Sequence, residues 1–131
     1  MTLRDGLTFH DGSEVTAQAV IDAITPISDK EHAGHNARVA KLLDLAGMTS
    51  DGGNVIVFET NSPNAAFPWT LSEPAIAVLG AASEDFPINA TGPYVFKEAV
   101  PEQLYRVEAN PDYRLGTPGL EEVRIVVSSN P

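Results

Sequence analysis

The stretch from Asn89 to Arg114, NATGPYVFKEAVPEQLYRVEANPDYR, carries the clearest indication of fold in this chain. Aromatic and apolar side chains recur at alternate positions on both sides of Pro101, a pattern typical of two half-buried strands. Because proline fixes φ and has no N–H to donate, Pro101 belongs to the connection between them. The sequence therefore predicts an antiparallel hairpin of residues 94–99 and 103–109, joined by a loop of about four residues.

Turn sequences bound this hairpin on both sides. Thr91-Gly92-Pro93 interrupts regular structure, so the first strand is expected to start at Tyr94. After the second strand, Asn110-Pro111-Asp112 predicts a turn, since the Asn side chain can accept a bond from an N–H two residues on and proline suits the next position.

Two segments resemble a known family. Residues 91–114 resemble the "GTGPY … NPDYW" signature of the extracytoplasmic solute-binding proteins of ABC transporters, family 5 type, which bind peptides, nickel complexes and similar solutes. Leu3 to Val20, LRDGLTFHDGSEVTAQAV, resembles the "LR.GV.FHDG" signature of the same family, in the same order. The departures are Arg114 in place of the usual Trp and Gln18-Ala19 in place of an acidic pair.

The resemblance implies a fold and a setting. It covers nearly all of the chain but only the early part of a family member several times longer, so residues 1–131 are expected to form a single subdomain of a two-lobed protein. The expected fold class is α/β (α+β mixed): two to three helices on an antiparallel or mixed sheet with hairpins, a subdomain of a periplasmic-binding-protein-like fold. Solute would lie between two lobes that close by a hinge.

The implied function is part of the substrate-binding component of an ABC transporter, which captures a peptide, nickel chelate or similar solute for a membrane permease. Its location would be periplasmic, or extracytoplasmic and membrane-anchored. The alternative is a ligand-sensing domain of a solute-binding-like transcription regulator, and the flanking gene sequence would separate the two. A small acidic hydrolase is a third reading, but the sequence shows no convergent acid, base or nucleophile for it.

Composition narrows these readings. The net charge of −10 opposes binding to a phosphate backbone, so no nucleic-acid partner is expected. No window of 18 apolar residues exists and no cysteine is present, which leaves no spanning segment and no thiolate metal site. No cofactor motif is present either. Met1-Thr2-Leu3-Arg4 does not resemble a signal peptide, and Met1 is expected to be an expression start of an excised subdomain.

Other elements are predicted from local patterns. A short strand is expected within Leu3–His10, followed by a turn at Asp11-Gly12 and a helix that Thr16 caps and Pro26 ends. After a polar loop over residues 28–36, Asn36 caps a second helix from Ala37. Periodicity lets this helix run to Gly47, whereas the family resemblance favours a strand over residues 44–50, and the pattern alone leaves both open.

In the middle of the chain, residues 55–60 predict a strand that completes a hairpin across the Asp51–Asn54 turn. Ser62-Pro63 predicts the start of a short helix, and Ala75–Leu79 a buried strand. The terminal segment Glu121–Val127 is strongly β-forming. It is expected either to fold back onto this domain's own sheet or to mediate a homodimer through edge pairing or exchange.

Few residues suggest chemistry, and none is expected to be catalytic. His10-Asp11 invites a general-base reading, but adjacent strand residues point to opposite faces, so a turn in which Asp11 accepts backbone N–H bonds is the preferred interpretation. His32 and His35 are spaced as two metal ligands could be, although an acidic loop explains them without metal. Trp69 is the candidate for solute contact, since it lies between Pro68 and polar residues.

Overall fold

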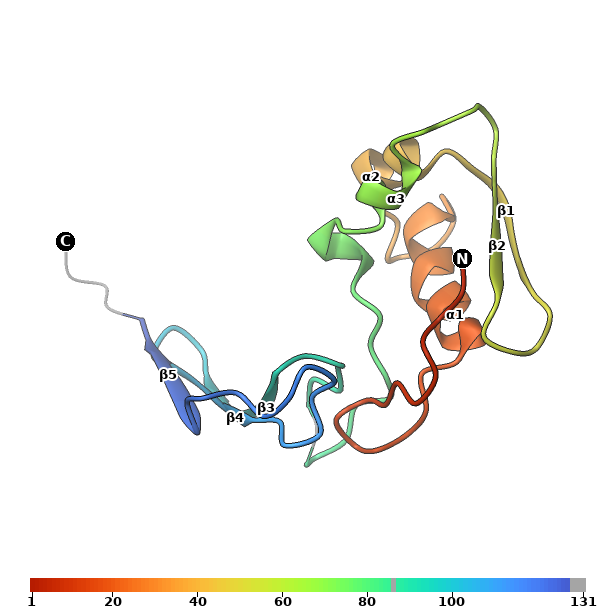
Figure 1. The fold of residues 1–131 in the computed structure, drawn as a ribbon. Helices are drawn as coiled ribbons and strands as arrows, with labels where there is room; N and C mark the ends of the chain where they lie inside the picture. The colour runs from red at the N-terminus through yellow and green to blue at the C-terminus, as the bar shows by residue number, and fades with distance from the viewer. Residues whose placement is uncertain (86, 128–131) are drawn as a thin grey trace. The chain divides into compact units, whose positions relative to one another are not determined.

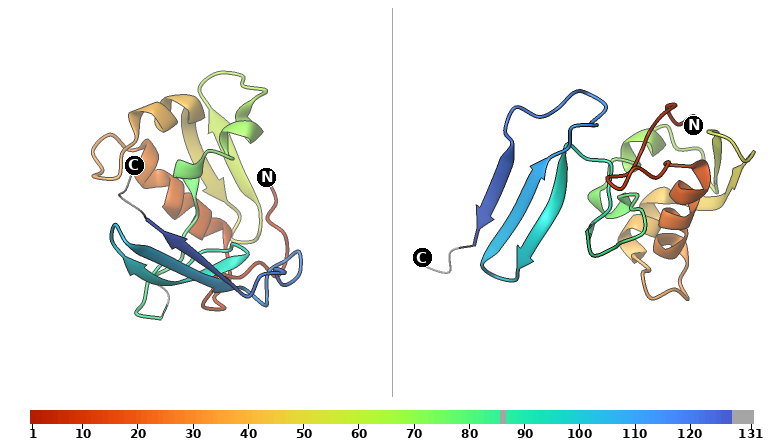
Figure 2. Two further views of the ribbon diagram at one scale, coloured as in Figure 1. Left: turned by 90° about the vertical axis from the view of Figure 1, so that its left-hand side faces the viewer. Right: turned by 90° about the horizontal axis from the view of Figure 1, so that it is seen from below.

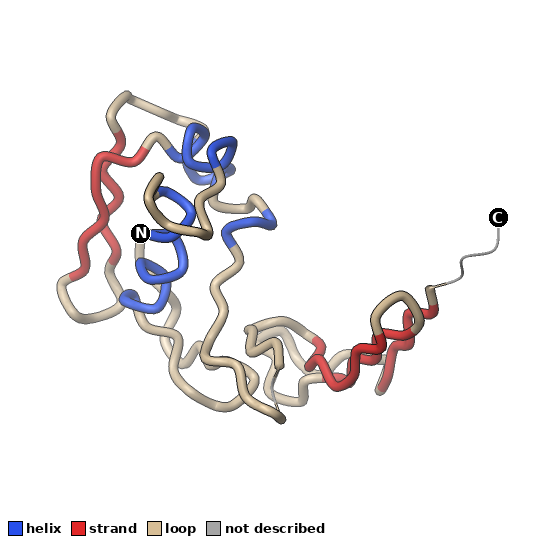
Figure 3. The backbone as a smooth tube through the Cα atoms, turned by 180° about the vertical axis from the view of Figure 1, so that it is seen from behind, coloured by secondary structure: helices blue, strands red, loops and turns tan. Residues whose placement is uncertain are grey.

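The computed structural model describes residues 1–85 and 87–127 of the chain (Figure 1). Its contacts divide the chain into two compact units. The first comprises Met1–Gly6 and Val15–Val78, and the second comprises Leu7–Glu14 and Leu79–Pro131. All the described helices lie in the first unit, as the secondary-structure colouring of Figure 3 shows. The expectation that residues 1–131 form a single subdomain of a larger protein stays a prediction.

Helix α1 (Ala17–Ser28) begins as the sequence predicts. The Thr16 hydroxyl accepts a hydrogen bond from the Ala19 N–H at 3.1 Å, which satisfies one of the free donors of the first turn. The prediction that Pro26 ends the helix is wrong. Proline removes one N–H donor only, and the last turn still closes through the Asp29 N–H on the Thr25 carbonyl at 3.0 Å.

Helix α2 (Ala37–Leu43) is capped by Asn36, whose side chain accepts from the Val39 N–H. The helix stops at Asp44, which adopts a left-handed backbone with φ of 46°, so Gly47 does not end it. The alternative that the family resemblance favoured is confirmed: β1 (Leu45–Ser50) follows directly and pairs antiparallel with β2 (Ile56–Thr60).

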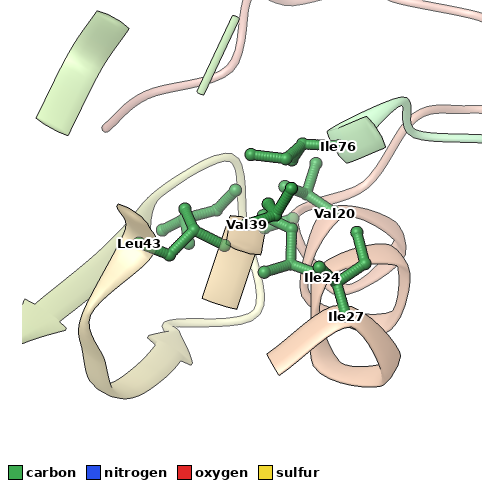
Figure 4. Close-up of a cluster of buried hydrophobic side chains, with 8 residues drawn as sticks. Val20, Ile24, Ile27, Val39, Leu43 and Ile76 are labelled. Carbon is green, nitrogen blue, oxygen red and sulfur yellow. The ribbon is translucent and has the colours of Figure 1, made fainter. Parts of the chain in front are cut away.

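An apolar cluster from the helices, β2 and a short 3-10 turn forms the core of the first unit (Figure 4). The side chains of Val39, Leu43 and Ile56 are completely buried, and Ile24 is 1% exposed. Burial of a side chain of this size contributes roughly 1.5–3 kcal/mol relative to its exposure. The buried members of the cluster are Ala17, Val20, Ile24, Ile27, Val39, Leu43, Ile56 and Ile76.

The segment after β2 differs from expectation at two places. Ser62-Pro63 does not start a helix. Helix α3 (Phe67–Thr70) starts later, after a turn in which the Asn64 side chain accepts a hydrogen bond from the Ala66 N–H. Pro68 lies in the first turn of α3, where an N–H would have no helical partner. Ala75–Leu79 is not a strand. Pro74 instead opens the 3-10 turn η1 (Pro74–Ile76), which closes through the Ala77 N–H on the Pro74 carbonyl.

The strand expected within Leu3–His10 is also absent. Within these residues only one isolated bridge occurs, between Thr8 and Glu14 in the second unit, and another bridge joins the preceding Thr2 to Val55 in the first unit. Gly6 lies between them with φ of +70°, a left-handed conformation that interrupts an extended strand. The turn predicted at Asp11-Gly12 is confirmed, with Gly12 at φ of +83°.

The second unit contains a three-stranded antiparallel sheet in the order β3-β4-β5 (Figure 2). Strands β3 (Tyr94–Val100) and β4 (Leu104–Ala109) confirm the predicted hairpin, with a bulge between Phe96 and Glu98. Strand β5 (Glu122–Val126) pairs with β4, which confirms the first alternative for the terminal segment, that it folds back onto the domain's own sheet.

The two faces of this sheet have different chemistry. Register places the Phe96–Val107–Val123 row on one face, while Glu98, Arg106 and Arg124 form a row on the other. The mixed α and β composition and the hairpins agree with the fold class expected from the sequence. Within the described ranges, no helix is long and apolar enough to cross a membrane.

Candidate functional site

Within the second unit, residues 7–14 of the first signature segment contact the start of the second signature segment and the residues just before it, although about 80 residues separate them in sequence. The His10 N–H donates to the Ala90 carbonyl at 2.8 Å, and one ring nitrogen of His10, Nε2, lies 3.1 Å from the Gly92 carbonyl oxygen. The Asp11 N–H donates to Asn89 Oδ1 at 3.2 Å. These hydrogen bonds therefore connect the turn at Asp11-Gly12 to the residues that lead into strand β3.

Asn89 is the centre of this junction and is 1% exposed. Its side chain accepts from Asp11 and donates to the Ala81 carbonyl at 3.1 Å, while its own carbonyl accepts from the Gly80 N–H at 2.8 Å. A Cβ at Gly80 would lie 2.6 Å from Asn89 Nδ2 and 3.0 Å from the Phe9 ring. Position 80 thus requires glycine, because the amide approaches the backbone too closely for any side chain.

His10 and Asp11 do not form an acid–base pair here. Since a carbonyl only accepts, His10 Nε2 carries the proton that faces Gly92, and Nδ1 accepts from the Ala90 N–H at 3.4 Å. Asp11 accepts from the hydroxyl and the N–H of Ser13, and the hydroxyl bond is the main cause that lowers the pKa of Asp11 below its ordinary value of 3.8. The interpretation of this dipeptide as a turn is confirmed.

The candidate metal ligands His32 and His35 lie in the loop between α1 and α2. His32 Nδ1 accepts from the Gly34 N–H at 3.0 Å, and His35 Nδ1 donates to the Ile27 carbonyl at 3.0 Å. Each imidazole therefore has one nitrogen in the loop's own hydrogen bonds. Among the described residues, no three His, Cys, Asp or Glu side chains gather as a metal site would require. Metal binding by this pair is untested.

Trp69, the candidate for solute contact, lies on α3 and is 79% exposed. The Ser72 hydroxyl bonds to the Trp69 carbonyl at 2.7 Å, so the backbone is fixed while the indole remains accessible. An exposed Trp contributes little to stability but offers a large apolar contact area with an N–H donor. Its part in binding stays a prediction.

Arg106 on β4 is a residue that sequence patterns did not single out. It bonds to carboxylates on all three strands: to Glu98 at 3.3 Å, to Glu108 at 2.5 Å and to Glu122 at 3.2 Å. Arg124 also bonds to Glu122, and this bond is the first cause that lowers the pKa of Glu122. The alternation in residues 103–109 predicts that Arg106 and Glu108 lie on one face of the strand. It does not predict the partners of Arg106 on β3 and β5, because these depend on the register between the strands.

This fold is shared with binding proteins of ABC transporters. The crystal structure of a nickel ABC transporter from Bacillus halodurans is similar to this chain, with a TM-score of 0.82 and 22% sequence identity. The match covers 98% of this chain and 26% of that one. The oligopeptide-binding protein AppA from Bacillus subtilis, in complex with a nonapeptide, matches with a TM-score of 0.81 and 24% identity, over 97% and 27%.

Sequence comparison leads to the same class. AppA of Bacillus subtilis (strain 168) is 27% identical over 134 aligned residues, which cover 92% of this chain and 24% of the relative. The bacterial extracellular solute-binding proteins, family 5 Middle, match residues 1–131, and the chain belongs to this family. It spans about a quarter of the length of these relatives.

Proposed function

We propose that this chain is part of the substrate-binding component of an ABC transporter. The observation that carries the proposal is the family match over residues 1–131, together with the contact between His10 Nε2 and the Gly92 carbonyl oxygen, which joins both signature segments. Among the relatives, AppA is named as an oligopeptide-binding protein, one structure is a complex with Ni(L-His)2 and another is a complex with agropinic acid. The solute proposed here is accordingly a peptide, a nickel chelate or a similar small solute.

In the proposed receptor, capture would require residues from both lobes. In two-lobed receptors the solute is enclosed between lobes that close by a hinge, so both lobes contribute contacts. The 131-residue chain alone is therefore expected to show no catalytic turnover and no tight solute site, whereas a longer protein that contains it would bind and deliver solute to a membrane permease outside the cytoplasmic membrane.

Calorimetric titration tests this proposal. The chain and the protein encoded by the complete reading frame are each titrated with a set of peptides and with nickel–histidine chelates. We expect saturable binding by the longer protein only. Submicromolar binding by the 131-residue chain would contradict a shared site, and the absence of binding of either solute class to the longer protein would contradict the proposed solute.

The homodimer expected from the terminal strand also remains a proposal. Strand β5 pairs with β4 on one side, and within the described residues no strand pairs with its other edge. Ile125 is 55% and Val126 is 72% exposed, and an apolar edge of this kind is a template for another strand. Light scattering of the chain with and without truncation after Gly119 tests it: a concentration-dependent dimer that the truncation abolishes supports edge pairing, and a monomer at all concentrations excludes it.

A further inference from the structure

A pocket of about 430 Å³ lies in the first unit, bounded by the end of α1, the loop that follows it, α2 and the start of β1. Its volume falls within the range of small-molecule sites. None of its lining residues belongs to the His10–Asn89 junction. Its polar lining consists of Ser28, Lys30, His35, Lys41, Asp44 and Asn61.

The charge of this lining contrasts with the rest of the chain, which carries a net charge of −10. Lys30 and Lys41 form no salt bridge with any described residue, whereas Arg38 close by is paired with Glu73. The ammonium groups of two lysines that line one pocket are thus not paired with a carboxylate among the described residues. Such groups attract an anionic ligand, and the attraction is stronger in a recess than on an open surface.

Asp44 contributes a negative charge to the same lining, but its carboxylate is already engaged. Asn61 Nδ2 donates to Asp44 Oδ1 and to the Asp44 carbonyl, each at 3.1 Å. The lysines and this carboxylate leave one net positive charge, which matches a singly charged ligand better than a dianion. The apolar side chains of Ala37, Ala40 and Leu45 complete the wall and suit a short hydrocarbon body.

The lining also contains one imidazole and one hydroxyl group. His35 Nδ1 donates to the Ile27 carbonyl at 3.0 Å, and this bond orients the ring. Ser28 also lines the pocket, and its hydroxyl oxygen is buried without a hydrogen-bond partner among the described residues. A buried hydroxyl without a partner is costly, and a rotation that brings it to a ligand oxygen would satisfy it.

From this arrangement we infer that the first unit holds a binding site for a small monocarboxylate with a short apolar body. Lys30 and Lys41 bind the carboxylate, and the alanine and leucine side chains contact the body. This inference does not rest on the proposed transport function.

The test is a ¹⁵N–¹H correlation titration of the intact 131-residue chain with sodium butyrate at constant ionic strength. We expect saturable shifts confined to the amides of the loop, α2 and the start of β1, around Lys41 and Leu45. Butyramide, which has the same shape without the charge, is expected to cause no such shifts. Inorganic phosphate is expected to bind more weakly than butyrate.

Matched variants assign the charges. Lys30→Gln and Lys41→Gln are each expected to raise the Kd for butyrate about threefold to tenfold, because each removes one ion pair between a solvent-accessible ammonium group and the carboxylate of the ligand. Arg4→Gln removes the same charge from an exposed position outside the pocket lining and is expected to leave the Kd unchanged. The spectrum of each variant shows whether it is folded.

Three results would overturn the inference. Shifts that rise linearly with butyrate or spread over both units mean that no site exists. An equal effect of Arg4→Gln and Lys41→Gln means that net charge alone attracts the anion. Phosphate binding as tight as that of butyrate means that the pocket does not select a monocarboxylate.

Discussion

The first unit is held by an apolar cluster, whereas the second is held mainly by hydrogen bonds between strands and turns. In the first, whole side chains such as Val39 and Leu43 are fully buried. In the second, the buried side chains of the described residues are Phe9, Val95 and the polar Asn89. Apolar burial tolerates small shifts of its neighbours, while a buried amide depends on a few partners with defined geometry. The two units should therefore respond to different substitutions.

The largest effect is expected in the apolar cluster. Leu43→Ala removes a completely buried side chain and should lower the free energy of unfolding by about 2–5 kcal/mol, through lost burial and a residual cavity. The matched control is Leu42→Ala on the same helix, where the side chain is 44% exposed and a loss below about 1 kcal/mol is expected. Urea denaturation measures both. Equal losses would mean that the cluster does not hold the unit together.

The second effect concerns the junction in the other unit. Asn89→Ala leaves the Asp11 N–H and the Ala81 carbonyl without their partner and should cost about 1–3 kcal/mol. Asn64→Ala is the control, because that side chain also accepts from a backbone N–H, of Ala66, but near solvent, and about 0.5 kcal/mol is expected. Hydrogen exchange should show faster exchange near Asp11 and Gly80 in the first variant. Unchanged exchange there would contradict the role of Asn89.

The same contrast explains what the sequence could predict. The hairpin around Pro101 depends on local periodicity and the start of α1 on the Thr16 cap, and both are confirmed. The predictions at Ser62-Pro63 and Ala75–Leu79 were wrong because both segments lie beside prolines. A proline is compatible with the start of a helix, a 3-10 turn or an extended segment, and the nearby hydrogen bonds determine which of these forms. Asn89 lies two residues before the second signature segment, but no local sequence pattern indicates its structural role. Its role depends on Asp11, 78 residues away in sequence.

A smaller difference in stability between the two units is expected at acidic pH. Hydrogen bonds from Arg124 and Arg106 lower the pKa of Glu122 below its ordinary value of 4.5. A carboxylate whose pKa is lowered by folding stabilises the folded state above its ordinary pKa, and this stabilisation is lost as the pH falls through the lowered value. We expect the β3–β5 sheet to lose stability in the window that begins near pH 4.5 and extends below it.

Glu122→Gln provides the comparison for that window. It should remove this part of the pH dependence and reduce stability slightly at pH 7, since exposed ion pairs contribute little. Hydrogen exchange of β4 and β5 amides between pH 6 and pH 3, corrected for intrinsic rates, measures it. A variant with the same pH profile as the wild type would show that the carboxylates around Arg106 do not stabilise the sheet.

The smallest effect on stability is expected at Trp69. Its side chain is 79% exposed, so Trp69→Ala should change the free energy of unfolding by no more than about 0.5 kcal/mol. Phe67→Ala is the control on the same short helix, because the Phe67 ring lies 5.2 Å from that of Phe58 and packs against the apolar cluster. That substitution should cost clearly more.

The exposed indole separates a structural role from a binding role. If Trp69 contacts solute in a longer binding protein, Trp69→Ala there should weaken solute binding at least tenfold while the chain's stability stays the same, since a buried aromatic anchor contributes about 2 kcal/mol or more to an interface. Fluorescence of Trp69, the only tryptophan of the 131 residues, reports on contact in this chain. Unchanged solute affinity would remove Trp69 as a candidate, and a large loss of stability would show that the indole is buried in solution.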